Sequence, residues 1–80
     1  MKPSEALTEV KNDLTTSFGD GLTARIIFNA RDITKASIFG LDKNKYIELI
    51  KTIASDDRVK GMWGDFGAKE KYSKWEKLVL

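Results

Sequence analysis

The N-terminal part of the chain has the hydrophobic spacing of an amphipathic helix. Pro3 and Ser4 are common at helix starts, and Gly19 belongs to the residue type that most often follows a helix end. Between them, an apolar stripe at helical spacing consists of Leu7, Val10, Leu14 and Phe18. This pattern predicts a helix over residues 3–18.

After this helix the hydrophobic period changes to two. Asp20-Gly21 is a turn signal, and residues 22–29 alternate between two faces, as half-buried strands do. The face expected to be buried carries Leu22, Ala24, Ile26 and Phe28. After a short polar stretch, residues 33–41 are rich in β-branched and aromatic side chains. We therefore expect two antiparallel strands, 22–29 and 33–41, joined by a hairpin.

The centre of the chain predicts a second helix. Asp42 is a good N-cap residue, and the helical spacing that follows it continues to about Ser55. The broad apolar face of this segment consists of Tyr46, Ile47, Leu49, Ile50, Ile53 and Ala54. A helix with this pattern packs one face against a core and leaves the other in water.

The C-terminal third predicts two further strands. Residues 59–66 look extended, and their two glycines, Gly61 and Gly64, indicate a bulge or a close backbone approach. Residues 75–80 alternate between two faces, which favours a closing strand after a loop through Ser73. A helical stripe competes with this interpretation and consists of Ala68, Tyr72, Trp75 and Val79.

The element order α-β-β-α-β-β predicts an α+β fold in a single domain, residues 1–80. Two helices would pack on one face of an antiparallel sheet of three to four strands, forming a two-layer sandwich. Moving the last strand to the front gives the ferredoxin-like order, so the chain is expected to be a permuted relative of that arrangement. The other face of the sheet would then be the place to look for binding.

The composition narrows the function further. The chain has 80 residues with no Cys and no His, which removes thiolate and imidazole chemistry. The net charge of +2 gives no strong overall field. With no long apolar window and an acidic start, we expect a soluble, cytoplasmic protein without a membrane partner. The absence of Gln and Cys beside many Lys, Glu and Ile is typical of heat-adapted or archaeal proteins.

Two groups of carboxylates are candidate ligands for Ca²⁺, which prefers hard oxygen donors. The first group follows one face of the N-terminal helix and consists of Glu5, Glu9 and Asp13. The second group would meet at the end of the second helix and consists of Asp56, Asp57 and Asp65. The plain alternatives are a solvated helix face and an acidic turn.

The segment from ITKASIFGLDKNKY (33–46) through VKGMWGDFG (59–67), with the chain's size and element order, resembles small single-domain α+β proteins of methanogenic archaea. This resemblance implies weak Ca²⁺ binding through surface acids. Ca²⁺ is the only cofactor that we expect.

Binding of single-stranded nucleic acid is the alternative. Lys60-Gly61 followed by Trp63 and Phe66 resembles the RNP1 strand of RRM domains, which implies base stacking on an open sheet face. The candidate contacts are Arg25, Lys35, Phe39, Lys60, Trp63, Lys69, Lys71 and Trp75. A lysine-rich segment whose stems cover its own aromatic rings is the plain explanation.

A third possibility is a small-molecule sensor. Residues 46–67 resemble the second half of ACT and feast-famine regulator domains, which implies ligand binding at a dimer interface. An exposed sheet face with Ile27, Phe39 and Trp63 would favour a homodimer or a protein partner. No nucleophile is paired with a recognisable base. The sequence therefore predicts a non-enzymatic binding or interaction module.

Overall fold

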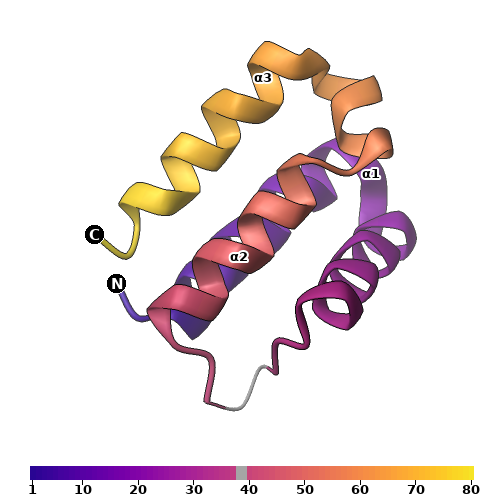
Figure 1. Ribbon diagram of the computed structural model, residues 1–80. Coiled ribbons are helices and arrows are strands. Elements are labelled where there is room, and N and C mark those ends of the chain that lie inside the picture. Colours follow the sequence, from indigo (N-terminus) through magenta and orange to yellow (C-terminus); the bar gives the residue numbers. More distant parts are fainter. Residues whose placement is uncertain (38–39) are drawn as a thin grey trace.

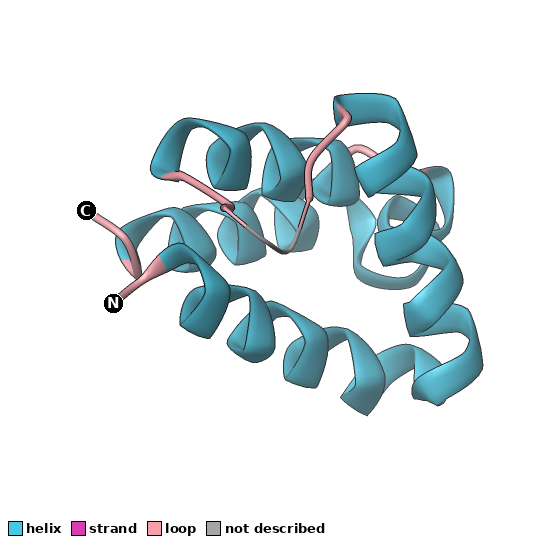
Figure 2. Ribbon diagram, turned by 90° about the horizontal axis from the view of Figure 1, so that it is seen from below, coloured by secondary structure: helices cyan, strands magenta, loops and turns pink. Residues whose placement is uncertain are grey.

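The part of the chain that the structure describes folds into three helical elements. In this computed structural model, which describes residues 1–37 and 40–80, α1 spans Pro3–Thr34, α2 spans Lys43–Ala54 and α3 spans Asp57–Lys77 (Figure 1). α2 packs against both other elements, whereas α1 and α3 touch each other much less. The two termini lie close together at one end of the bundle (Figure 1 and Figure 2).

α1 is two helical arms joined by a break at Gly19. This glycine has φ 78° and ψ 171°, whereas the residues on either side of it are helical. Such backbone angles are essentially restricted to glycine, because a Cβ atom would clash with the chain itself. Asp20 begins the second arm, where a carboxylate interacts favourably with the partial positive charge of a helix start. The arms meet at a sharp angle, so α1 turns back on itself (Figure 1).

α3 is broken in the same way at Gly64. Its φ of 76° and ψ of 166° repeat the geometry of Gly19, and Asp65 again begins the arm that follows. An aromatic residue precedes each glycine, and the rings of Phe18 and Trp63 lie in contact with centroids 5.7 Å apart. The two breaks are therefore side by side in space, and each contains the sequence aromatic-Gly-Asp.

Capping side chains fix where α2 and α3 begin. The backbone N–H of Lys45 donates to the Asp42 carboxylate at 2.7 Å, and that of Arg58 donates to the Asp56 carboxylate at 2.8 Å. These bonds satisfy amide groups that the first turn of a helix leaves without partners. The helix predicted from Asp42 is confirmed, as is the helix over 3–18, which forms the first arm of α1.

One hydrophobic core lies among the three elements. α2 contributes a continuous buried face, and α1 and α3 contribute the residues that cover it. The fully buried large side chains are Trp75, Tyr46, Leu14, Ile26, Leu49, Ile50, Ile53, Val10 and Val59.

The expected α+β sandwich is wrong, because the residues that the structure describes contain no strand. The segment 22–29 is helical within α1, and the described part of 33–41 is the end of that helix and a loop. The segment 59–66 belongs to α3, and residues 75–80 are its last turn and a short tail. The loop expected before the closing strand is helical as well.

The alternation in the second arm of α1 is a misleading signal. The side chains that this arm buries are Thr23, Ile26 and Ala30, at helical spacing, while Phe28 is 68% exposed. Thr and Ala carry little hydrophobic signal, so the true stripe is hidden beside the stronger apparent period of two. Tertiary packing then outweighs the weak helix propensity of the β-branched residues.

The glycine breaks lead to a first prediction. We expect Gly19→Ala and Gly64→Ala each to lower the free energy of unfolding by about 1–3 kcal/mol, because alanine is strained at these backbone angles. Apart from adjacent residues and the backbone of the same helix, no described atom lies within 4 Å of a Cβ at either position, so the cost would come from the local backbone alone. Urea unfolding measures the change.

Two other glycines are matched controls. Gly21 and Gly61 are helical, and a Cβ added at either of them would also meet no neighbour within 4 Å. Gly21→Ala and Gly61→Ala should therefore stabilise the protein by about 0.5–1 kcal/mol. Equal effects at the break and control positions would contradict the broken-helix geometry.

Candidate functional site

The sheet face on which the nucleic-acid candidates were expected to gather does not exist in the described chain. Arg25 is exposed on the second arm of α1, and Lys35 ends α1 with φ 59°. Phe39 lies outside the described residues. The structure therefore does not support RRM-like base stacking. The sheets implied by the resemblances to ACT domains and to small α+β proteins of methanogenic archaea are also absent from residues 1–37 and 40–80.

Trp75 belongs to the core, and Trp63 packs against it. Trp75 is fully buried, and its indole N–H donates to Asp13 Oδ2 at 2.8 Å. Its backbone carbonyl accepts a 2.8 Å bond from the hydroxyl of Tyr46, and burial raises the pKa of that phenol above its ordinary value. Trp63 is half-buried, donates to Ser17 Oγ at 2.8 Å and meets Trp75 edge-on at 6.1 Å. Neither ring offers a free stacking surface.

Lys71 and Lys74, on the C-terminal arm of α3, make contacts with Asp13 and Trp63. Lys74 Nζ lies 3.0 Å from Asp13 Oδ2, and Lys71 Nζ lies 4.0 Å from the same oxygen. Lys71 also sits over the ring of Trp63, 5.4 Å from its centroid, in a cation–π contact. Through Asp13 these side chains link α3 to α1, so they are less available to a ligand than unpaired lysines.

Asp13 has an unusual environment for a helix carboxylate. Partial burial acts to raise its pKa, but hydrogen bonds from Trp75 and Lys74 and the charges of Lys71 and Lys74 outweigh burial. The pKa of Asp13 therefore lies below its ordinary value. The carboxylate is a structural anion, already surrounded by donors, and has little capacity left for a metal ion.

The other candidate metal ligands are scattered or already paired. Arg58 donates to Asp56 through Nε at 3.0 Å and Nη2 at 2.8 Å, and these bonds lower the pKa of Asp56. Glu5 accepts from the backbone of Lys2, and both Glu9 and Asp57 are exposed. Within 1–37 and 40–80, no three carboxylates come together in a way that could hold a metal ion.

The structure does bring two of the nucleic-acid candidates together, beside Asp65, one of the candidate metal ligands. Lys60 and Lys69 line a groove of about 520 Å³ between the C-terminal end of α2 and both arms of α3. The break at Gly64 makes this possible, because Lys60 comes before it and Lys69 after it. The complete lining consists of Lys51, Ala54, Ser55, Lys60, Asp65, Ala68, Lys69 and Tyr72.

This groove is cationic. Lys51, Lys60 and Lys69 have no ion pair or hydrogen bond through their side chains in the part of the chain that the structure describes, and Asp65 is the single acid in the lining. Small residues form part of the wall, and the ring of Tyr72 forms another part. Such a groove can hold an anionic group among several ammonium groups, beside an aromatic surface.

Lys51 and Tyr72 are not among the candidate contact residues predicted from the sequence. The helical pattern places Lys51 on the wet face of its helix and Tyr72 in an apolar stripe. No local pattern links these two residues to Lys60 and Lys69, because the groove arises only when the broken α3 packs against α2.

Comparisons of the chain with models of protein families, with curated proteins and with solved structures find no match. In the described part of the chain, no helix combines the length and the apolar character that crossing a bilayer requires.

The Asp13 cluster leads to a second prediction. Near pH 7, Asp13→Asn should lower the free energy of unfolding by about 1 kcal/mol, because hydrogen bonds to a charged acceptor are stronger than those to a neutral one. The pKa of Asp13 is lower in the folded state than the value of about 3.9 expected when unfolded. Its contribution is therefore present above about pH 4 and lost as the pH falls through the folded-state pKa.

Urea unfolding of the variant and the wild type near pH 7 and at about pH 3 tests this pH dependence, because their difference should shrink in acid. Glu9→Gln is the matched control, since Glu9 lies one turn away on the same helix and is exposed. We expect it to change stability by less than about 0.5 kcal/mol. A loss at Glu9 as large as that at Asp13 would refute the structural role.

Proposed function

We propose that this chain is a non-enzymatic binding module whose groove between α2 and α3 binds single-stranded nucleic acid. The observation that carries the proposal is the convergence of Lys51, Lys60 and Lys69, all without ionic partners among the described residues, on one groove. Phosphates supply most of the affinity in non-specific nucleic-acid binding, and lysine is a common partner for them.

The shape of the groove favours a single strand over a duplex. The groove has a volume of about 520 Å³, and a flexible single strand can bend so that successive phosphates approach its three ammonium groups. A duplex presents its phosphates on a stiff, convex surface that cannot bend in this way. The half-buried ring of Tyr72 lines the same groove and offers one apolar surface for a base. Its hydroxyl donates to Glu76 at 3.2 Å, which holds the ring in place.

The competing interpretations have less support. A Ca²⁺ module would need carboxylates that share a site, and those of Asp13 and Asp56 are taken by neighbouring cations. A sensor of the ACT type would need a sheet. The nucleic-acid interpretation needs only exposed cations near a groove, so it no longer depends on the expected sheet.

The salt dependence of binding gives a third prediction. Each phosphate contact with a single strand contributes roughly −0.7 to the slope of log K against log salt concentration. Three lysines should therefore give a slope of roughly −2, and Lys60→Gln with Lys69→Gln should reduce it to roughly −0.7. Fluorescence anisotropy of a labelled oligothymidylate, titrated at several salt concentrations, measures both slopes.

The control for this experiment carries the same charge change elsewhere. Arg25 and Lys43 are exposed and do not line the groove. Arg25→Gln with Lys43→Gln should leave the slope near that of the wild type. If the two double variants bind equally weakly, attraction depends on net charge alone and the groove is not the site. If the wild type does not bind at low salt, the proposed function is wrong.

A further inference from the structure

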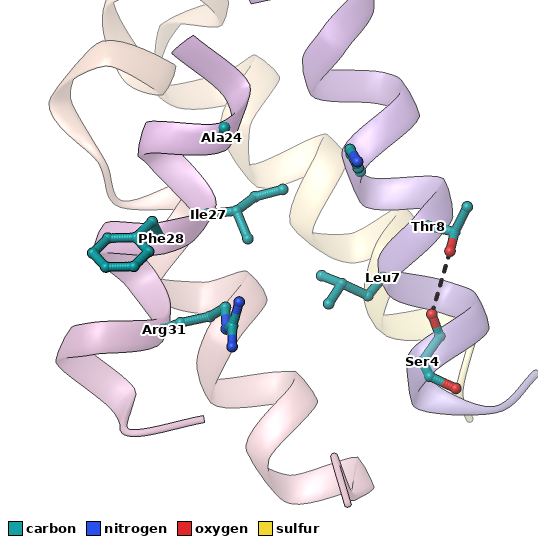
Figure 3. Close-up of a pocket in the computed structure, with 8 residues that line it drawn as sticks. Ser4, Leu7, Thr8, Ala24, Ile27, Phe28 and Arg31 are labelled. Atoms are coloured by element: carbon teal, nitrogen blue, oxygen red, sulfur yellow. Dashed lines mark hydrogen bonds between the residues drawn. The ribbon is translucent and has the colours of Figure 1, made fainter. Parts of the chain in front are cut away.

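A second groove lies between the two arms of α1. It has a volume of about 440 Å³ and is independent of the groove between α2 and α3. Its lining comes from both arms and consists of Ser4, Leu7, Thr8 and Lys11 with Ala24, Ile27, Phe28 and Arg31. The side chains of Leu7 and Ile27 point toward one another across it (Figure 3). The break at Gly19 creates this groove by folding the second arm back beside the first.

The interior of the groove is apolar, and its charged residues are all cationic. Phe28, on its edge, is 68% exposed, which leaves a large ring in water. No carboxylate lines the groove, and Lys11 makes no ion pair in the described chain. An apolar interior with cations and no acid is complementary to a ligand that has a hydrocarbon body and an anionic head.

Arg31 is the residue that the anionic head of such a ligand would contact. Its side chain extends from the second arm toward the space between Leu7 and Ile27 (Figure 3). Its Nε is buried without a hydrogen-bond partner in the described residues, although buried donors are nearly always satisfied. Asp32 lines a smaller neighbouring hollow with Arg31 and Phe28, but no ion pair joins the two charges. The Arg31 side chain makes no ion pair or hydrogen bond in the described chain, so the outer nitrogens of the guanidinium remain available for an anion.

We propose that this groove binds a free single-chain fatty acid. The carboxylate would pair with the guanidinium of Arg31, which matches carboxylate geometry in a bidentate way. The hydrocarbon chain would run between Leu7 and Ile27 and cover part of Phe28. The groove volume falls within the range of about 300–1,000 Å³ that is typical of small-molecule sites.

Titration calorimetry with laurate below its micelle concentration tests the proposal. We expect saturable binding of laurate, no binding of acetate, and much weaker binding of dodecyltrimethylammonium, which has the same chain with the opposite charge. Arg31→Gln should weaken laurate binding about tenfold or more, because it removes a charge-assisted bond. Arg25→Gln is the matched control on the same arm, and it should bind laurate as the wild type does.

A second variant tests the apolar part of the groove. Ala24 is exposed and lines the groove, so Ala24→Phe should fill it and abolish binding without disturbing the core; circular dichroism verifies that the variant is folded. Equal binding of the cationic surfactant, unchanged affinity in Arg31→Gln, or unchanged affinity in folded Ala24→Phe would overturn the proposal. The variant Lys60→Gln with Lys69→Gln should keep wild-type laurate affinity, so this result does not depend on nucleic-acid binding.

Discussion

The rest of the structure depends on two hydrogen bonds made by Trp75. Its indole N–H reaches Asp13 on α1, and its carbonyl accepts from Tyr46 on α2, both at 2.8 Å, so one residue of α3 joins all three elements. Trp75 and Tyr46 are fully buried, and a buried polar group without its partner is costly. The same junction engages Lys71 and Lys74 through Asp13, which separates the structural lysines from those free to bind a ligand.

The second constraint is the pair of glycine breaks. Straight helices as long as α1 and α3 would extend past the short α2 and leave apolar surface uncovered. The breaks at Gly19 and Gly64 fold each long helix into two arms, and Phe18 and Trp63 pack where the breaks meet. Each break also brings residues from two arms to one groove: Gly19 for the apolar groove of α1, and Gly64 for the cationic groove beside α2. The two glycine breaks thus make the chain compact and form both candidate binding sites.

The sequence reveals elements whose signals are local, but not how those elements meet. The helices starting at Pro3 and Lys43 are predictable because a start signal, Pro3 in the first and the cap Asp42 in the second, agrees with the apolar spacing that follows. Gly19 and Gly64 instead have the local signals of a helix end and a strand bulge, since nothing nearby indicates that a helix resumes after them. Lys60 and Lys69 are predictable as nucleic-acid candidates, but on a sheet; their groove depends on packing against α2. The bond from Trp75 to Asp13 spans 62 positions, beyond any periodicity in the chain.

Solution NMR of the ¹⁵N,¹³C-labelled protein tests the central claim, that a bundle of broken helices is joined at Trp75, most directly. Such a bundle predicts helical Cα shifts over 20–34 and 57–77, interrupted only at Gly64, together with nuclear Overhauser effects from the Trp75 indole to the Asp13 and Tyr46 side chains. Extended-strand shifts over 22–29 and 59–66, with cross-strand contacts between backbone protons and none from the indole to Asp13, would contradict it.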